Sequence, residues 1–283
     1  MKNLWYNDNI GILRKSWELS RLFFVALGSC GSFGKGESMN YINQIYNEDC
    51  IAGMSRYPDQ SIDMILCDLP YGMTGCRWDS LLPFDQLWSQ YLRIIKPNGA
   101  IALTGCQPFT TKLISSNPKM FKYCWYWYKN MVTGFANAKK QPLRCVEEVC
   151  IFYRKQPVYH PQGIIVLDHP IKNRGKKVSS RNDDVYRVGT LGKDTETYIT
   201  HYPRQVLEIK CQREGLHPTQ KPVELFEYLI RTYTNPGDLV LDTCMGSGTT
   251  AIACLNSGRN YTGFEWDEQY YKVIQKRIMG YQR

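Results

Sequence analysis

The sequence predicts an α/β protein with a doubly wound, mostly parallel sheet. Short apolar runs, such as 61–67 and 239–242, indicate buried strands. They alternate with segments of helical periodicity, such as 84–95, which is the order typical of parallel strands joined by helical crossovers. Polar residues directly follow two of the apolar runs, at the sheet edge where open α/β sheets bind their ligands.

The predicted elements begin at residue 41. Strands are expected at 41–46, 61–67, 100–103, 123–128, 148–153, 239–242 and 260–264, and helices at 51–57, 84–95, 108–116, 223–233 and 249–257. Lys96-Pro97-Asn98-Gly99 is a helix-stop signal before the strand at 100–103. Thr219 is the expected cap of the helix at 223–233, and Pro222 suits its first position.

The periodic pattern stops between residues 154 and 214. This stretch carries twelve Lys and Arg against seven Asp and Glu, a net charge of +5, with tyrosines among the cations. A segment of this length inside a compact domain is usually functional or disordered. Basic charge interleaved with aromatic rings favours a nucleic-acid surface, and a solvated irregular insertion is the alternative.

Composition favours a cytoplasmic protein without membrane association. The 283 residues are 43% hydrophobic, enough for a buried core, and the net charge of +9 favours a polyanionic partner. Eleven cysteines without a Cys-x-x-Cys pair, and four scattered histidines, indicate reduced thiols and no metal site. The apolar run at 22–27 is too short for a signal peptide or a bilayer span. Residues 1–38 are therefore expected to be an accessory extension, with Met39 as a candidate start.

The tetrapeptide Asp68-Leu69-Pro70-Tyr71 ends the predicted strand at 61–67. A carboxylate, a nearby backbone carbonyl and a flat ring together suit a planar ring that carries an exocyclic amino group. The two oxygens can accept the two amine hydrogens, and the planar ring can stack on the tyrosine. Because Asp and Pro are also common turn residues, the tetrapeptide alone favours a plain strand-to-loop turn over a binding site.

A second polar cluster follows the strand at 239–242. Asp242 starts a glycine-containing loop with Gly246 and Gly248, a helix and a strand follow, and Glu265 ends that strand. Glycines let a backbone approach a ligand closely, and an acid at this distance usually holds ribose hydroxyls. The arrangement predicts a site for a nucleoside-containing cofactor. A tight turn with a capping acid is the alternative, and the missing third glycine argues against a nicotinamide dehydrogenase.

The order of these motifs resembles the β-order, amino-directed DNA methyltransferases. Asp-x-Pro-Tyr comes first, His-Pro-Thr-Gln-Lys-Pro follows at 217–222, and Asp-x-x-x-Gly-Ser-Gly-Thr-Thr comes last at 242–250. Gln107-Pro108-Phe109 and Trp127-Tyr128-Lys129-Asn130 bring the chain nearest to phage-type, adenine-specific members. The resemblance implies a class I S-adenosylmethionine-dependent fold with circularly permuted motif order.

The resemblance also implies roles for individual residues. Asp68 would accept one hydrogen of the target amine, the carbonyl of Leu69 the other, and Tyr71 would stack on a flipped base beside Pro70. Family members usually carry Pro at position 69, and Pro and Phe at positions 243 and 244, where this chain has Thr243 and Cys244. The implied contacts of S-adenosylmethionine are Asp49, Cys50, Thr219, Lys221, Asp242, Gly246, Gly248 and Glu265.

For the whole chain, the resemblance implies four segments and a double-stranded DNA substrate. Residues 39–153 would be the catalytic half, 154–214 the target-recognition insertion and 215–283 the cofactor-binding half, after the extension 1–38. Aspartate at position 68 favours adenine N6 as the methyl acceptor, and cytosine N4 is the alternative. Two alternative functions from other classes are an inactive DNA-binding module and a methylase that acts on RNA or protein. A homodimer and a partner restriction endonuclease stay open.

Overall fold

The computed structural model describes residues 41–73, 75, 79–173, 194–212, 215–216 and 219–281. The expected N-terminal extension, residues 1–38, lies outside this part of the chain, and so does the middle of the basic insertion. Among the described helices, none combines the length and the apolar composition needed to cross a bilayer.

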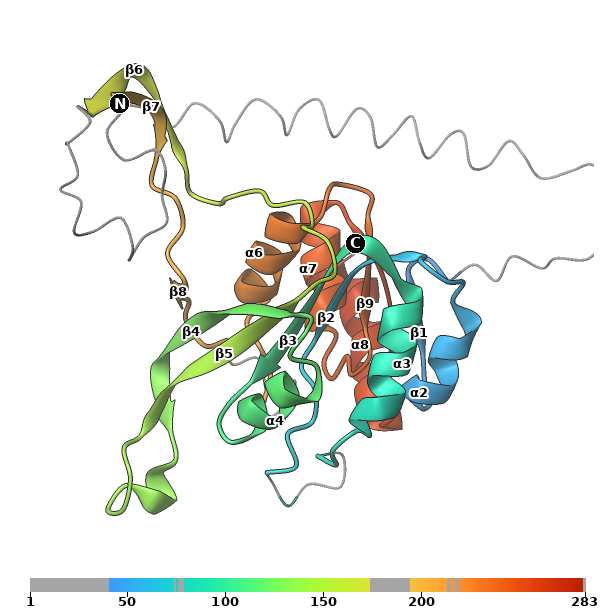
Figure 1. The fold of residues 1–283 in the computed structure, drawn as a ribbon. Helices are drawn as coiled ribbons and strands as arrows, with labels where there is room; N and C mark the ends of the chain where they lie inside the picture. The colour runs from blue at the N-terminus through green and yellow to red at the C-terminus, as the bar shows by residue number, and fades with distance from the viewer. Residues whose placement is uncertain are drawn as a thin grey trace, which may run out of the picture. The chain divides into compact units, whose positions relative to one another are not determined.

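Eight strands of the described residues form one mixed sheet (Figure 1). Its spatial order is β1-β10-β9-β2-β3-β5-β4-β8. All neighbours pair in parallel except β5, which is antiparallel to both β3 and β4. The predicted mostly parallel α/β sheet is therefore confirmed. The strands are β1 (Gln44–Tyr46), β2 (Ile62–Cys67), β3 (Ile95–Gly105), β4 (Phe121–Thr133), β5 (Arg144–Phe152), β8 (Val206–Glu208), β9 (Leu239–Asp242) and β10 (Asn260–Phe264).

Helices cover both faces of this sheet. Met64 and Leu66 of β2 pack with apolar residues of α6 (Val223–Tyr233), α7 (Thr249–Ser257) and α8 (Glu268–Tyr281). Ile65 and Cys67 point to the other face and pack with α2 (Cys50–Gly53), the 3₁₀ turn η1 (Met54–Arg56), α3 (Phe84–Ile94) and α4 (Phe109–Ser116). Because both faces of β2 are buried, its sequence is continuously apolar rather than alternating, apart from Asp63.

The third strand begins earlier than predicted. The helix α3 ends at Ile94, as the stop signal predicts, but β3 already starts at Ile95. The pairing with β2 is irregular here, because Ile62 faces Ile95 while Met64 faces Ala100. A side chain at Gly99 would lie 2.7 Å from the backbone oxygen of Asp63, so glycine permits this close approach. The helix-stop residues thus form a bulge within the strand.

The predicted cap of α6 is wrong. Pro222, not Thr219, is the residue that precedes the first helical residue, Val223. Proline has no side-chain acceptor, and the backbone N–H of Val223 instead donates to Oε1 of Gln212, 3.0 Å away. A helix start can be satisfied by a side chain from a distant segment, and such a partner leaves no local sequence signal.

The basic segment 154–214 is not without secondary structure. β6 (Ile165–Asn173) and β7 (Thr195–Thr200) form an antiparallel two-stranded sheet of their own. Ile165, Val166 and Ile171 are all exposed, so β6 buries no continuous apolar face and shows no alternating pattern. Near the end of the segment, β8 joins the main sheet in parallel with β4.

Candidate active site

Four acidic residues meet at one edge of the main sheet. Asp49 and Glu265 follow β1 and β10, Asp242 ends β9, and Asp68 follows β2. These four strands are parallel neighbours, so their carboxyl ends lie side by side. A cavity of about 390 Å³ opens there. It is lined by Glu48, Asp49, Cys50, Asp68, Leu69, Pro70, Tyr71, Met73, Asp79, Ser80, Leu82, Thr219, Gln220, Lys221, Phe226, Asp242, Thr243, Cys244, Met245, Gly246, Ser247, Thr249, Glu265, Trp266 and Tyr270.

Every site residue that the sequence predicts lines this cavity, except Gly248. Gly248 has a positive φ of 79° and precedes the first residue of α7. A side chain there would lie 2.8 Å from Cγ2 of Ile274 in α8. Its conformation and its close packing against α8 account for the glycine, without a contact to a ligand.

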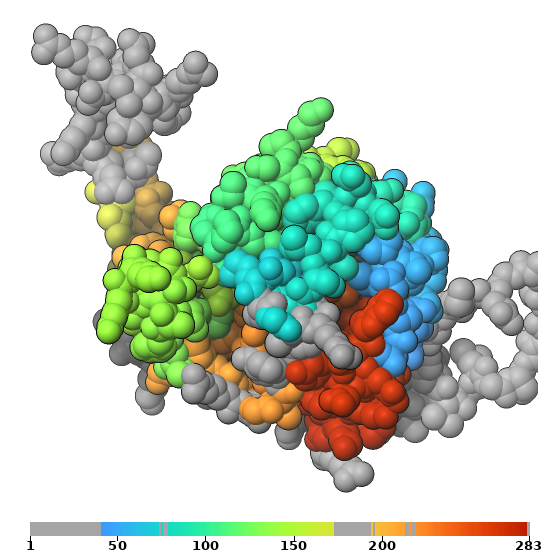
Figure 2. All heavy atoms as spheres, turned by 90° about the horizontal axis from the view of Figure 1, so that it is seen from below, coloured from blue at the N-terminus to red at the C-terminus, as the bar shows by residue number. Residues whose placement is uncertain are grey.

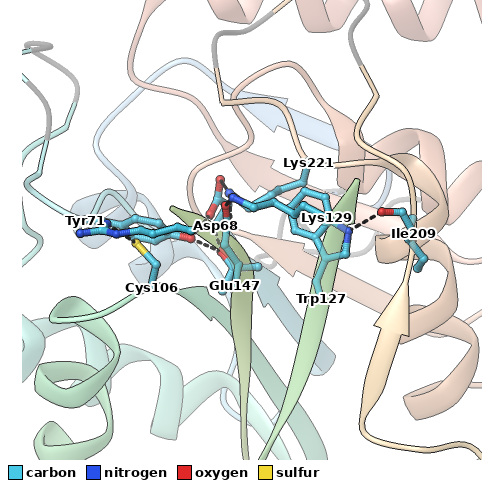
Figure 3. A network of polar contacts seen from close by, with 10 residues as sticks. Asp68, Tyr71, Cys106, Trp127, Lys129, Glu147, Ile209 and Lys221 are labelled. Atoms are coloured by element: carbon cyan, nitrogen blue, oxygen red, sulfur yellow. Dashed lines mark hydrogen bonds and ion pairs between the residues drawn. The ribbon is translucent and has the colours of Figure 1, made fainter. Parts of the chain in front are cut away.

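The carboxylate of Asp68 is held by three donors, of which Figure 3 labels Tyr71 and Lys221. Its Oδ1 accepts hydrogen bonds from the hydroxyl of Tyr71, at 2.8 Å, and from the hydroxyl of Thr104 on β3. Its Oδ2 accepts from Nζ of Lys221, at 2.7 Å, and this lysine lies just before α6. The residues come from three distant parts of the sequence, and Thr104 was not predicted.

The ring of Tyr71 is fixed from behind. It stacks on Phe109 of α4, with ring centroids 4.8 Å apart and planes inclined by 28°. Burial, followed by the negative charge of Asp68, raises the pKa of the Tyr71 phenol well above its ordinary value. The phenol therefore stays neutral and remains a hydrogen-bond donor to Asp68.

A row of buried charges extends from Asp68 into the β4–β5 pair (Figure 3). Lys221 Nζ also lies 3.3 Å from Oε2 of Glu147 on β5, and Oε1 of Glu147 accepts from Nζ of Lys129 on β4, at 2.8 Å. The side chains of Lys221 and Lys129 are each 6% exposed, and that of Glu147 is 17% exposed. Charges buried to this degree require partners, and here each has at least one.

The charge states in this row follow from the pairing. Burial alone would raise the pKa of Glu147, but the ammonium groups of Lys221 and Lys129 more than offset it and hold this pKa below its ordinary value. For Lys221, burial acts to lower the pKa, and the carboxylates of Asp68 and Glu147 outweigh it and raise the pKa. Asp68 is thus linked through Lys221 to an acid and a second lysine.

Asp242, at the start of the glycine loop, and Glu265, after β10, both accept hydrogen bonds from backbone N–H groups. The N–H of Gly246 donates to Oε2 of Glu265 at 2.7 Å, and the N–H of Asp267 donates to Oε1 at 2.8 Å. Oδ1 of Asp242 accepts from the N–H of Cys244 at 2.9 Å, and Oδ2 accepts from the hydroxyl of Thr250. Burial is the main cause that raises the pKa of Glu265 to about 7 and that of Asp242 to about 6.

Thr243, one of the two departures from the family pattern in this loop, has two polar neighbours inside the protein. The hydroxyl of Thr243 lies 2.6 Å from the hydroxyl of Tyr91 and 3.2 Å from Sγ of Cys67. Thr243 is buried, so its polar group is satisfied inside the protein. Asp49 also has a structural task, because its Oδ1 accepts from the N–H of Ala52 and caps α2.

Sequence reasoning missed several residues of this site. Glu147 and Lys129 carry charge within strands, and their pairing is visible only once β4 and β5 are placed side by side. Trp266, with 72% of its surface exposed, follows Glu265 and lines the cavity. Its position directly after the predicted ribose-binding acid is the signal that could have identified it.

Comparison with known proteins agrees with this geometry. Residues 62–276 match the N6/N4 family described as DNA methylase. Putative methylase YubD of Escherichia coli (strain K12) is 48% identical over 235 residues, 83% of this chain and 89% of YubD. The M1.HpyAVI–SAM complex has a TM-score of 0.55 at 24% identity, covering 83% of this chain and 98% of that one.

The structure of PvuII DNA methyltransferase (cytosine-N4-specific) has a TM-score of 0.59 at 18% identity, covering 87% of this chain and 90% of that one. Likeness at these identities shows a shared fold. The family match and the alignment with YubD, at 48% identity, each cover most of the chain, and they show the family as well as the fold. This protein belongs to the N6/N4 DNA methylase family.

Proposed function

We propose that this protein transfers a methyl group from S-adenosylmethionine to the N6 amine of an adenine in double-stranded DNA. The observation that carries the proposal is the shared cavity. The carboxylate of Asp68, oriented by three donors, lines the same cavity as the Gly246–Glu265 hydrogen bond and Asp49. An amine acceptor and a nucleoside-binding loop thus face one space.

The cavity suits S-adenosylmethionine in size and in charge. Its volume of about 390 Å³ lies within the range of cofactor pockets. Glu265 offers carboxylate oxygens to ribose hydroxyls, and Gly246 lets the backbone approach. Asp49, Asp242 and Glu265 surround the space with acidic groups, which favours a cationic ligand. The cofactor supplies a methyl group on a sulfonium cation.

The residues around Asp68 determine which of its oxygens can receive the amine. Oδ1 already accepts two hydrogen bonds, whereas Oδ2 accepts one, from Lys221, and keeps a lone pair. Oδ2 is therefore the acceptor for one amine hydrogen, and the carbonyl of Leu69 takes the second. With both hydrogens held, the nitrogen lone pair turns out of the ring plane and the positive charge that develops on the amine is stabilised.

Leu69 and Tyr71 complete this arrangement. Leu69 packs in the apolar cluster with α3 and α4, so its backbone carbonyl is the part that serves the amine. Leucine can then replace the usual proline without loss of the acceptor. Tyr71, backed on one face by Phe109, is the ring on which a base flipped out of the duplex would stack.

Segment 154–214 is the proposed target-recognition region, between the catalytic half at 39–153 and the cofactor-binding half at 215–283. Its net charge of +5 suits the phosphate backbone. Cytosine N4 is the second candidate acceptor, because its amine has the same geometry and the PvuII enzyme, which is cytosine-N4-specific, shares the fold. Aspartate at position 68 favours adenine.

The test is expression in a host that lacks DNA methylation, followed by sequencing that detects modified bases. N6-methyladenine in one short motif is the expected result, N4-methylcytosine would select the second candidate, and unmodified DNA would contradict both. Asp68→Ala should abolish methylation and leave S-adenosylmethionine binding, measured by calorimetry, nearly intact. If Asp68→Ala lost methylation and S-adenosylmethionine binding equally, Asp68 would not be the acceptor for the target amine. Because Lys221 loses a partner in that variant, Asp68→Asn is the matched control for folding.

A further inference from the structure

Past the main sheet, β4 and β5 continue as a two-stranded ribbon, residues 130–146. β4 pairs with β8 at Tyr126–Tyr128, and β5 pairs with β3 from Glu148 onward. Beyond these positions β4 and β5 pair only with each other within the described chain, at Tyr128 with Val146 and at Thr133 with Arg144. Figure 1 shows the ribbon leaving the sheet and ending in a loop, and Figure 2 shows it at the molecular surface.

The ribbon leaves the sheet at the catalytic edge. Since β5 is antiparallel to both β3 and β4, β4 runs in the same direction as β3 and β2. Its carboxyl end therefore points the same way as the end of β2, where Asp68 lies. At the base of the ribbon, Lys129 and Glu147 connect through Lys221 to Asp68 by contacts of 2.8, 3.3 and 2.7 Å. The buried ion pairs fix the base of the ribbon beside the reacting carboxylate.

The ribbon is basic and carries an exposed aromatic ring. Residues 130–146 include Lys139, Lys140 and Arg144 and contain no acid. Phe135 follows Gly134, which has a φ of 94°, and starts the 3₁₀ turn η2 (Phe135–Asn137) in the ribbon's loop. It is 66% exposed. A phenylalanine exposed to water on a cationic projection indicates a partner that is anionic and offers flat apolar surfaces.

We propose that this ribbon is a second DNA-binding element, separate from the segment 154–214, and that Phe135 packs against the bases beside the target nucleotide. The inference rests on the proposed function, because it takes DNA as the substrate. Extruding a base unstacks its neighbours, and an apolar ring placed between base steps replaces part of the lost stacking. Lys139, Lys140 and Arg144 contact phosphates and hold the ring in place.

A second copy of this chain is a weaker fit for the same surface. Two ribbons that meet would bring six cations together without an acid in either 130–146 segment. Like charges in contact disfavour such an interface. A nucleic acid offers the opposite charge along its whole length.

The test compares ribbon variants with controls on α8. Phe135→Ala and the double variant Lys139→Ala/Lys140→Ala change exposed residues, and Met279→Ala and Lys276→Ala are matched exposed positions on α8. Binding is measured with a duplex that carries 2-aminopurine at the target base, over a series of salt concentrations. Cofactor binding by calorimetry and thermal unfolding are recorded for each variant, and both should equal wild type.

The two ribbon variants should fail in different ways. Phe135→Ala should weaken duplex binding about tenfold and reduce the 2-aminopurine fluorescence of the bound complex, with an unchanged salt dependence. The double lysine variant should reduce the slope of log K against log salt by about 2. The α8 variants should match wild type in both measurements.

The outcomes separate this inference from the proposed function. If wild type methylates DNA while the ribbon variants behave like the α8 variants, the inference is overturned and the function stands. If wild type neither binds nor methylates DNA, the function fails and the inference with it. If the ribbon variants change only the sedimentation behaviour of the free protein, the ribbon is a contact between copies and the inference is wrong.

Discussion

Glu147→Gln is the most informative single change, because it leaves the shape of the site and removes one charge. Glu147 lies between two ammonium groups, Lys129 at 2.8 Å and Lys221 at 3.3 Å, each 6% exposed. Removing one partner of a buried ion pair costs about 3–5 kcal/mol. Lys221 keeps Asp68 and Glu147 is itself partly exposed, so the lower end applies, about 3 kcal/mol.

Thermal and urea unfolding measure this loss. For a domain of this size, about 3 kcal/mol corresponds to a fall in Tm of about 6–12 °C. The control is Glu227→Gln on α6, whose partner Arg231 lies 2.7 Å away and four residues on, with both side chains partly exposed. An exposed helix pair of this kind contributes about 0.3–0.5 kcal/mol. Methylation should also slow in Glu147→Gln, because Lys221 then pairs with Asp68 alone and competes more strongly with the amine for Oδ2.

The pH dependence gives the same argument a second test. The folded protein holds the pKa of Glu147 below its ordinary value. The stabilisation is therefore complete above the ordinary pKa and is lost as the pH falls through the lower, folded value. The difference between Glu147→Gln and wild type should shrink below about pH 4.3. Equal destabilisation by Glu147→Gln and Glu227→Gln at neutral pH would refute the buried-pair reasoning.

Two further predictions follow from other positions. Burial raises the pKa of Glu265 to about 7, so the folded state keeps a proton that the unfolded state loses. The free energy of unfolding therefore includes a contribution from Glu265 that is present at pH 4 and is lost as the pH rises through 7. The contribution that is lost is about 3 kcal/mol. Between pH 5 and pH 8, the free energy of unfolding measured in urea should therefore fall less in Glu265→Gln than in wild type. Parallel pH curves for the two proteins would contradict the prediction. Gly248→Ala should destabilise by about 2–4 kcal/mol, since it combines a positive φ with a clash against Ile274. Gly258→Ala, with a φ of 71° in free space, should cost only about 1 kcal/mol, and equal values would show that the contact with Ile274 is unimportant.

Local sequence patterns are sufficient to predict strands that are buried on both faces of the sheet. The runs that became β2 and β9 are apolar because helices cover both faces, and the acids at their ends necessarily share one edge. Asp68, Asp242 and Glu265 could therefore be placed at the same site from the sequence. The family resemblance added Asp49, Thr219 and Lys221, which also line the cavity.

Partners that meet only through the fold could not be predicted. The row from Asp68 to Lys129 depends on the register of β4 against β5 and on the approach of the α6 start to β2. The N–H of Val223 at the start of α6 donates to Gln212, a residue distant in the sequence, which local patterns could not predict for the same reason. Gly248 has the sequence context of a ligand contact, yet its neighbour in space is Ile274.

The return of the chain to the main sheet at β8 sets limits on exchanging the proposed recognition segment between family members. Val206–Glu208 extends the sheet beside β4, and the backbone oxygen of Ile209 accepts from Nε1 of Trp127 at 2.8 Å. A few residues later, Gln212 completes α6. A chimera joined at 214 would replace an edge strand and a helix cap along with the recognition surface. Junctions near 160 and 204 transfer the hairpin alone, and the acceptor's own catalytic framework stays intact.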